Sequence, residues 1–280
     1  YVVFNKLISF ISDNPQLFLA ITSLFIFSLI GYIYYRFSVN VYLSIIIFVC
    51  FGLYMFSFTG LRQAIAFSIT FFSFKFIVER KIKHFLVSVF LAFSIHSSAI
   101  IYFFVWPLWN IRHTNKLAIS LLGITFLLLP FYGAIFSFVV PLLFREKYLT
   151  YMNGGSAINL IILYLFIYLL PLFIKTNDFS VKNDIYKNNL ELQIENFIRW
   201  MAYCSFLFQS LGLIGGDSIT RIAFYFSVFL PLYIPIIFKR AKFKSLIYTC
   251  ITILFIAFFY HDTSKEFYNI VPYIFFWELI

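Results

Sequence analysis

The sequence predicts an all-α, polytopic integral membrane protein with about eight full spans and a re-entrant or short hairpin around residues 85–109. Of its 280 residues, 62% are hydrophobic and 11% are charged. A soluble domain is closer to half apolar and one quarter charged. Apolar stretches of about 20 residues, the length that crosses a bilayer as a helix, recur along the whole chain. We therefore expect a single transmembrane domain over residues 1–280.

Eight apolar stretches have roughly the length of a spanning helix. They are Leu17–Tyr35, Val41–Phe58, Gln63–Val78, Leu117–Val140, Ala157–Ile174, Phe197–Ile214, Ile222–Phe238 and Ser245–Tyr260. A polar segment over residues 175–196 is predicted to be a cytoplasmic loop. The chain begins with Tyr1 rather than Met, so we expect its natural N-terminus to be missing.

The stretch 85–109 is long for one span and short for two. Polar residues interrupt its middle at Ser94, His96, Ser97 and Ser98. A single crossing would leave most of the later Lys and Arg residues outside, against the positive-inside rule. A turn near His96 instead places most of them inside, with the basic cluster Glu79–His84. We therefore predict a hairpin, which is tolerated in a membrane where protein or water shields it.

This topology assigns Arg62, Arg145, Arg221 and His96 to the outer face. The net charge of +10 then reflects basic cytoplasmic loops, and we expect a lipid bilayer rather than nucleic acid as the partner.

Three inward-running helices are predicted to begin at that face, with N-caps at Thr59, at Ser156 and at Asp217-Ser218. Helix N-termini attract anions. Arginines at these ends therefore predict a phosphate site, since guanidinium binds phosphate in a bidentate way. The alternative is that the arginines contact only lipid headgroups.

His96 is a candidate base, because a polar residue inside an apolar segment is costly and imidazole accepts a proton near neutral pH. The alternative is a structural role in the hairpin turn. We expect the other histidines, His84, His113 and His261, to be solvated at the interfaces.

Tyr148 and Tyr151, in the external loop, are candidates for stacking on sugar rings or for the interfacial aromatic belt. No Asp or Glu lies in the middle of a predicted span, where ion-coupled transporters place carboxylates. No nucleotide loop, zinc spacing or nucleophile elbow is present in the sequence. We expect no metal and no cofactor.

Three segments resemble the EpsG family of Wzy-type polysaccharide polymerases. FTGLRQAIAF, residues 58–67, has the family's Arg-Gln pair at the start of a helix, and LAFSIHSSAI, residues 91–100, has its His-containing turn. The basic run ERKIKH lies between them. GGDSITRIAFYFSVFLPLYIP, residues 215–235, is similar to the family's Arg-then-aromatic helix.

The resemblance implies a multi-pass protein of the bacterial cytoplasmic (inner) membrane that joins undecaprenyl-diphosphate-linked oligosaccharides into capsule, exopolysaccharide or O-antigen. It implies an inverting, metal-independent glycosyltransferase. Arg62 and Arg221, with Arg145, would hold the diphosphate, and Gln63 would orient a phosphate or sugar oxygen. His96 or Asp217 would be the base. A chain-length regulator and a flippase are the implied neighbours.

Three alternatives remain from the sequence. A flippase or exporter should line a central cavity with charge along its depth, and a membrane O-acyltransferase should carry its histidine on the cytoplasmic side or in a tunnel. A structural subunit of an export complex needs no site.

Overall fold

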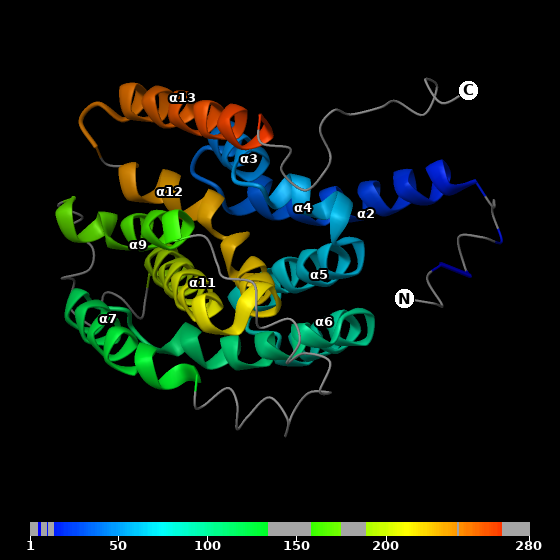
Figure 1. The fold of residues 1–280 in the computed structure, drawn as a ribbon, viewed down its shortest axis with the longest axis horizontal. Coiled ribbons are helices and arrows are strands. Elements are labelled where there is room, and N and C mark those ends of the chain that lie inside the picture. Colours follow the sequence, from blue (N-terminus) through cyan, green and yellow to red (C-terminus); the bar gives the residue numbers. More distant parts are fainter. Residues whose placement is uncertain are drawn as a thin grey trace.

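The structure is a computed structural model that describes residues 5–6, 10, 14–133, 158–174, 189–239 and 241–264. Every regular element in these residues is helical. The helices are α2 Pro15–Phe37, α3 Val41–Cys50, α4 Leu53–Thr59, α5 Leu61–Val78, α6 Ile82–Ile95, η1 Ser97–Asn110, α7 Asn115–Leu128, η2 Leu129–Phe131, α9 Ile158–Phe173, α11 Leu190–Ser227, α12 Leu230–Phe238 and α13 Lys244–Thr263. Several of them run side by side along the long axis of the molecule (Figure 1).

Polar side chains define where several helices begin. Asn14, Asn40, Thr114 and Asn189 each accept a hydrogen bond from a backbone N–H two or three residues ahead, at the starts of α2, α3, α7 and α11. Such N-caps satisfy donors that have no partner within the helix. The start of α11 at Leu190 also shows that the end of the predicted loop 175–196 is helical.

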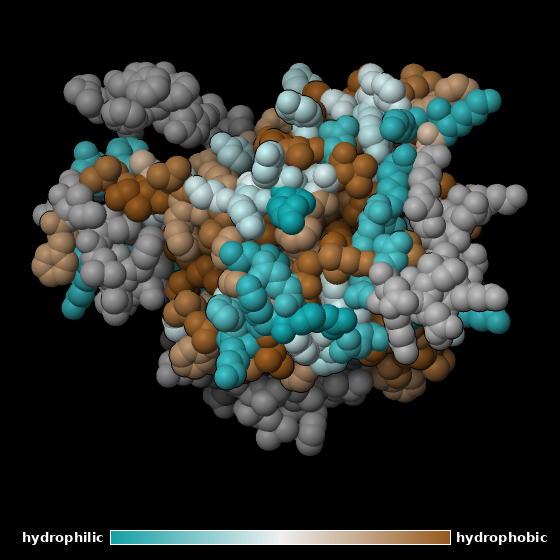
Figure 2. All heavy atoms as spheres, turned by 180° about the vertical axis from the view of Figure 1, so that it is seen from behind, coloured by the Kyte–Doolittle hydropathy of each residue, from teal (hydrophilic) through white to brown (hydrophobic). Residues whose placement is uncertain are grey.

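The surface is that of a membrane protein. Large apolar side chains are well exposed on several helices, among them Leu24, Phe90, Leu127 and Leu254. Figure 2 shows hydrophobic residues over broad areas of one face, between patches of hydrophilic residues. A soluble monomer rarely exposes so much contiguous apolar surface.

The predicted number of full spans is not confirmed by the described helices. Three of them are long and apolar enough to cross a membrane, or five if each of two bent pairs counts as one span. The bent pairs are α3 with α4 and the end of α11 with α12. Other apolar helices are short: α9 has 16 residues and so spans roughly 24 Å, against about 30 Å of hydrocarbon.

The predicted hairpin is present, and its two arms are different kinds of helix. The first arm, α6, is an α-helix of 14 residues, and the second, η1, is a 3-10 helix of 14 residues. A 3-10 helix rises about 2.0 Å per residue rather than about 1.5 Å, so the second arm is the longer. The chain turns at His96, and Arg80 Nη1 donates a hydrogen bond to Asn110 Oδ1 at 2.9 Å. The start of the first arm and the end of the second arm therefore lie together, away from the turn at His96.

The bundle has two ends that differ in chemistry. We call the end that carries Gly60–Gln63, His96–Ser98 and Arg221 the arginine end. The other, the basic end, carries Arg80, Asn110–Asn115, Glu191 and Lys239. At the basic end Lys239 forms ion pairs with Glu191 and Glu195, which join the start of α11 to the end of α12.

Helix α11 changes direction at Gly216. Its φ of 63° and ψ of −161° are not helical, and a positive φ is readily adopted only by glycine. The break separates a long first part of α11 from Ile219–Ser227. It brings Arg221 back toward the first turn of α5.

Candidate functional site

Three residues from distant parts of the sequence meet at the arginine end. The positive charges of Arg221 and Arg62 both act electrostatically on His96. Arg62 is the second residue of α5, His96 lies in the hairpin turn, and Arg221 follows the break in α11. Both arginine side chains are exposed, whereas His96 is partly buried. The structure therefore brings together three of the predicted site residues.

Gln63 holds α5 and α11 in this arrangement. Its side-chain Nε2 donates a hydrogen bond to the backbone carbonyl of Arg221, and only 3% of Gln63 is exposed. The sequence resemblance predicted that Gln63 orients a substrate oxygen. In the structure its amide nitrogen donates to the backbone that carries Arg221.

An aromatic contact joins α4 to α11 beside the same site. The ring of Phe56 packs on that of Phe224, with centroids 4.2 Å apart. Phe56 precedes Gly60 by one helical turn, and a Cβ on Gly60 would lie 2.4 Å from Phe56 Cζ. Gly60 therefore lets the phenyl ring occupy the space between α4 and the start of α5, where Arg62 begins its helix.

The hairpin turn is joined to α11 by a second polar contact. The Ser98 and Tyr225 hydroxyls lie 3.0 Å apart, within hydrogen-bonding distance. Nearby, the ring of Tyr102, four residues after Ser98, stacks on that of Phe226, the residue after Tyr225, with centroids 6.3 Å apart. These contacts fix His96 relative to Arg221, because Ser98 and Tyr225 lie close to them in sequence.

The helix starts at the site differ in part from those predicted. Thr59 is the last residue of α4, and its hydroxyl donates to the carbonyl of Phe56 instead of capping α5. The N-cap of α5 is Gly60, which has no side chain for this purpose. The first N–H groups of α5 therefore add to the positive potential beside Arg62.

The electrostatics favour an uncharged His96. Its partial burial lowers its pKa below 6.5, and the charges of Arg221 and Arg62 lower it further. A protonated imidazole is disfavoured both by lost hydration and by nearby cations. At neutral pH His96 is therefore able to accept a proton, and the two arginines place positive charge beside it.

Other predicted site residues are not placed by the structure. Four of them lie outside the described residues: Arg145, Tyr148, Tyr151 and the predicted cap Ser156. The backbone of Asp217 belongs to α11, but its side chain also lies outside what the structure describes. In the parts of the chain that the structure covers, no group of three or more His, Cys, Asp or Glu residues could hold a metal ion.

The expectation of a solvated His113 is wrong. His113 is fully buried at the basic end, 3.1 Å from the Tyr168 hydroxyl through Nε2, and packs edge-on to Trp200. Burial, and then the charge of Arg199, lower its pKa to about 3. The basic residues beside His113 in sequence indicated a solvated segment, but the imidazole faces the interior.

Arg199, which the sequence reasoning missed, is fully buried beside His113. Its guanidinium donates to the carbonyl of His113 at 3.1 Å and to Asn115 Oδ1 at 2.8 Å. Asn196 accepts from the N–H of His113 and donates to the carbonyl of Ile111. The polar residues of α11 recur at helical spacing at 196, 199 and 203, and this pattern was the available signal. The cluster fixes the segment between η1 and α7 against α11.

Comparison with known proteins adds to this geometry. The family model described as the EpsG family matches residues 1–275. No curated protein and no solved structure matches the chain. The motifs at residues 58–67 and 91–100 are the ones that supply Arg62, Gln63 and His96 to the arginine end. Since the match extends over nearly the whole sequence, this membrane protein belongs to the EpsG family and takes part in polysaccharide biosynthesis.

Proposed function

We propose that the protein polymerises lipid-diphosphate-linked oligosaccharide repeat units at the outer face of the bacterial cytoplasmic membrane. The observation that carries the proposal is the convergence of Arg62 and Arg221 on His96. Two cations beside an uncharged base suit a transfer in which a diphosphate leaves and a hydroxyl attacks. Undecaprenyl diphosphate is the expected lipid carrier.

The two arginines would bind and neutralise the leaving diphosphate. Guanidinium groups pair with phosphate oxygens in a bidentate way, and such charge-assisted bonds are stronger than neutral ones. Negative charge grows on the diphosphate as the anomeric C–O bond breaks, so fixed cations stabilise the transition state more than the ground state. The N–H groups at the start of α5 would contribute to the same field.

His96 would act as the general base. It would take the proton of the acceptor hydroxyl as that oxygen forms its bond to the anomeric carbon. A one-step displacement of this kind inverts the anomeric centre, and we propose that it proceeds without a metal ion. Asp217 is the second candidate base.

The arrangement favours an enzyme over the alternative functions. In a flippase, charge is expected along a central path, whereas these cations gather at one end of the bundle. In a membrane O-acyltransferase, the histidine is expected to be reached from the cytoplasm. Placing the arginine end outside keeps the basic end in the cytoplasm, as the positive-inside rule requires.

The direct test uses purified protein with undecaprenyl-diphosphate-linked repeat units and gel analysis of the products. Wild type should give a ladder, and Arg62→Ala should reduce the rate by roughly 100-fold or more, because a preorganised transition-state cation is lost. Lys83→Ala is the matched control, since Lys83 is an exposed cation outside the arginine end. No ladder from wild type with its cognate unit, or equal ladders from all three, would refute the proposal.

A second test locates the site relative to the membrane. His96→Cys and Lys242→Cys variants, made in a background without the three native cysteines, are treated in whole cells with a membrane-impermeant thiol reagent. We expect labelling at residue 96 and none at residue 242. The reverse pattern would favour an acyltransferase that faces the cytoplasm.

A further inference from the structure

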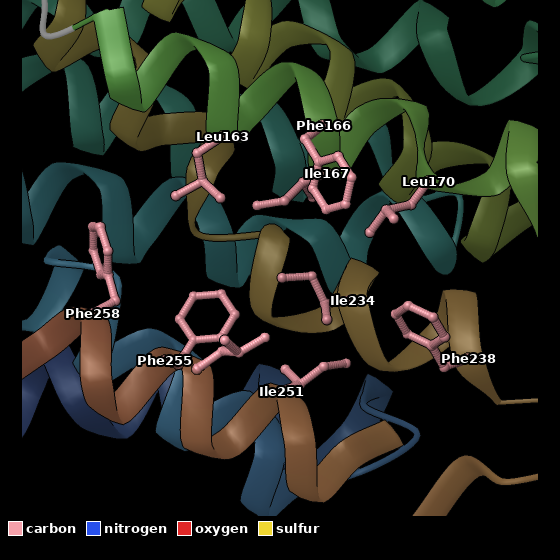
Figure 3. A pocket seen from close by; sticks show the side chains of 10 residues that line it. Leu163, Phe166, Ile167, Leu170, Ile234, Phe238, Ile251, Phe255 and Phe258 are labelled. Carbon is pink, nitrogen blue, oxygen red and sulfur yellow. The ribbon is translucent and has the colours of Figure 1, made fainter. Parts of the chain in front are cut away.

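A cavity of about 390 Å³ lies between α9, α12 and α13, away from the arginine end. Among the described residues, the lining side chains are all apolar, for example Leu163 and Phe166 of α9, Ile234 and Phe238 of α12, and Ile251 and Leu254 of α13. Figure 3 shows the side chains of α9 and α13 pointing toward each other across the space, with those of α12 between them. Helices α9 and α13 both pack on α12 but not extensively on each other.

The cavity opens to the surroundings of the helices. Phe166 and Leu254 line it and are 58% and 68% exposed. In a membrane protein, this opening faces hydrocarbon. A cavity that takes a polar small molecule normally has a few polar groups to orient it. This lining has none, so it suits a hydrocarbon chain.

Positive charge lies beyond one end of the cavity. Phe238 immediately precedes Lys239 at the end of α12, and Ile251 is two turns after Lys244, the first residue of α13. Lys242 and Lys244 are exposed, and the first turn of α13 contains no acidic residue. A helix N-terminus is itself positive, so an anion there would offset both the dipole and the lysines.

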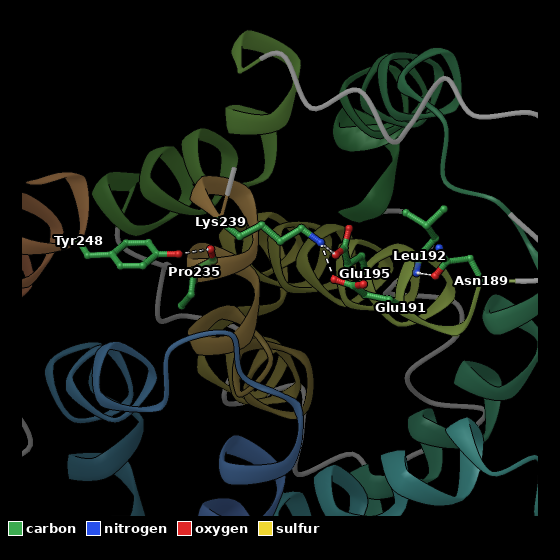
Figure 4. Close-up of polar contacts among 7 residues, drawn as sticks. All are labelled: Asn189, Glu191, Leu192, Glu195, Pro235, Lys239 and Tyr248. Carbon is green, nitrogen blue, oxygen red and sulfur yellow. Dashed lines mark hydrogen bonds and ion pairs between the residues drawn. The ribbon is translucent and has the colours of Figure 1, made fainter. Parts of the chain in front are cut away.

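The same end of the cavity is held in place by polar contacts. The Tyr248 hydroxyl donates to the carbonyl of Pro235 at 2.9 Å, which fastens α13 to α12 (Figure 4). Lys239 is engaged by Glu191 and Glu195 (Figure 4). Its charge is thus largely compensated, whereas Lys242 and Lys244 are exposed.

We propose that this cavity binds one acyl chain of an anionic phospholipid, whose phosphate lies at Lys242 and Lys244. The lipid fills the space between α9 and α13 and so completes the packing of α13. Within the described bundle, the spanning window of this helix has no buried residue, so the lipid would cover apolar surface that the protein leaves open. Basic pockets between helices at one membrane surface are known to bind anionic headgroups.

The isoprenoid chain of a lipid-diphosphate substrate is a poorer fit. Its diphosphate would be held at the arginine end, whereas the cavity reaches toward the basic end. An acyl chain that enters from the leaflet at the basic end has its phosphate where the lysines are. The site is therefore independent of the proposed polymerase activity.

The test measures the melting temperature of the full-length chain, purified in a mild detergent, with added phosphatidylglycerol, phosphatidylcholine or undecaprenyl phosphate. At saturation, phosphatidylglycerol should raise the melting temperature of wild type by roughly 5 °C or more, since a ligand that binds only the folded state stabilises it. Phosphatidylcholine should give a clearly smaller rise. The double variant Lys242→Ala/Lys244→Ala should respond equally to both phospholipids.

A cavity-filling variant tests the position of the chain. Leu254→Trp places a large ring at the mouth of the cavity, and the control Ile253→Trp adds the same ring at a 61% exposed neighbour outside the lining. The control should keep the phosphatidylglycerol response, and Leu254→Trp should lose it. Equal responses of the two variants would overturn the proposal. It would also be overturned if undecaprenyl phosphate were the only lipid that stabilised wild type, or if none of the three lipids did.

Discussion

The side-chain amide of Gln63, in the first turn of α5, donates a hydrogen bond to the backbone carbonyl of Arg221 in α11, 158 residues away in sequence. The bond is partly buried and joins the two helices that carry the site arginines. It places the guanidinium of Arg221 on the same end of the bundle as Arg62. The distance between these two cations therefore depends on Gln63.

Replacing Gln63 by Leu should lower activity and stability together. Leu has a similar size but cannot donate, so the carbonyl of Arg221 loses this partner, at a cost of about 1 kcal/mol. We expect a lower melting temperature and a roughly 10-fold or larger loss of polymerisation rate, as Arg221 shifts from its position. Gln16→Leu, at an exposed position in α2, is the control. An unchanged rate in Gln63→Leu would show that the bond does not position Arg221.

Gly60→Ala should disturb the start of α5. Its Cβ would lie 2.4 Å from Phe56 Cζ, and the Phe56 ring has little freedom to move, since it is 2% exposed and packs on Phe67 and Phe224. Overpacking of this kind typically costs about 1–3 kcal/mol. We expect a lower melting temperature and a loss of activity through displacement of Arg62.

The steric explanation has its own control and rescue. Gly123→Ala, within α7, meets no atom within 4 Å and should leave the melting temperature unchanged or slightly higher, since Ala favours helix over Gly. The double variant Gly60→Ala/Phe56→Leu should regain part of the lost stability. A Gly60→Ala protein that is as stable and active as wild type would contradict the role of this contact.

The rate of polymerisation should fall in acid with an apparent pKa below 6.5. His96 must be uncharged to accept a proton, and its pKa is lowered by burial and by Arg221 and Arg62. As the pH falls through that lowered value, the imidazole is protonated and the base is lost. A pH–rate profile of the purified enzyme measures this limb.

Two variants test whether the fall of the pH–rate profile in acid is due to His96. In Arg62→Gln, one of the cations that lower the pKa is gone, so the limb of the residual activity should move to higher pH. His96→Gln should be largely inactive, and any residual rate should lack this limb. A limb that is identical in wild type and His96→Gln would assign the base to another residue.

The buried His113 should make the protein less stable in acid. Its pKa is about 3 in the folded protein and about 6.5 in an unfolded chain. Between these values the unfolded chain binds a proton that the folded chain does not bind. The free energy of unfolding should therefore decrease as the pH falls from about 6.5 toward 3.

The pH dependence of the melting temperature measures this effect. His113→Gln should be less stable near neutral pH, because its ring contacts are lost, but should show a smaller decrease in acid. His84→Gln, at an exposed histidine, should keep the full decrease. Equal slopes for wild type and His113→Gln would show that His113 does not titrate as its burial requires.

The helical class, the membrane location and the hairpin were predictable because they depend on local properties. Apolar length determines what can cross a bilayer, and the distribution of Lys and Arg favoured a turn at His96. The number of full spans was less predictable. A run of apolar residues does not reveal that η1 is a 3-10 helix, that α3 and α4 are bent, or that α9 is shorter than the hydrocarbon layer.

The site was predictable as a set of residues but not as a geometry. Charge placement and the family resemblance singled out Arg62, Gln63, His96 and Arg221 as candidates. Neither could show that the Gln63 amide nitrogen donates to the backbone of Arg221. His113 was misjudged because its neighbours in sequence are basic and polar. Which side of a short connecting segment is buried depends on the helix that packs over it.

The sequence alone determined that this chain is a helical membrane protein. It also determined that most Lys and Arg residues lie in basic loops and a few at the ends of apolar helices. Hydrophobic length and charge distribution act within each segment, so they can be read along the chain. Only the tertiary structure decided that Arg62 and Arg221 share a site with His96, that Arg199 is buried beside His113, and that α9 and α13 leave a cavity between them. These relationships arise where helices far apart in sequence cross, and the crossing is set by the packing of the whole bundle.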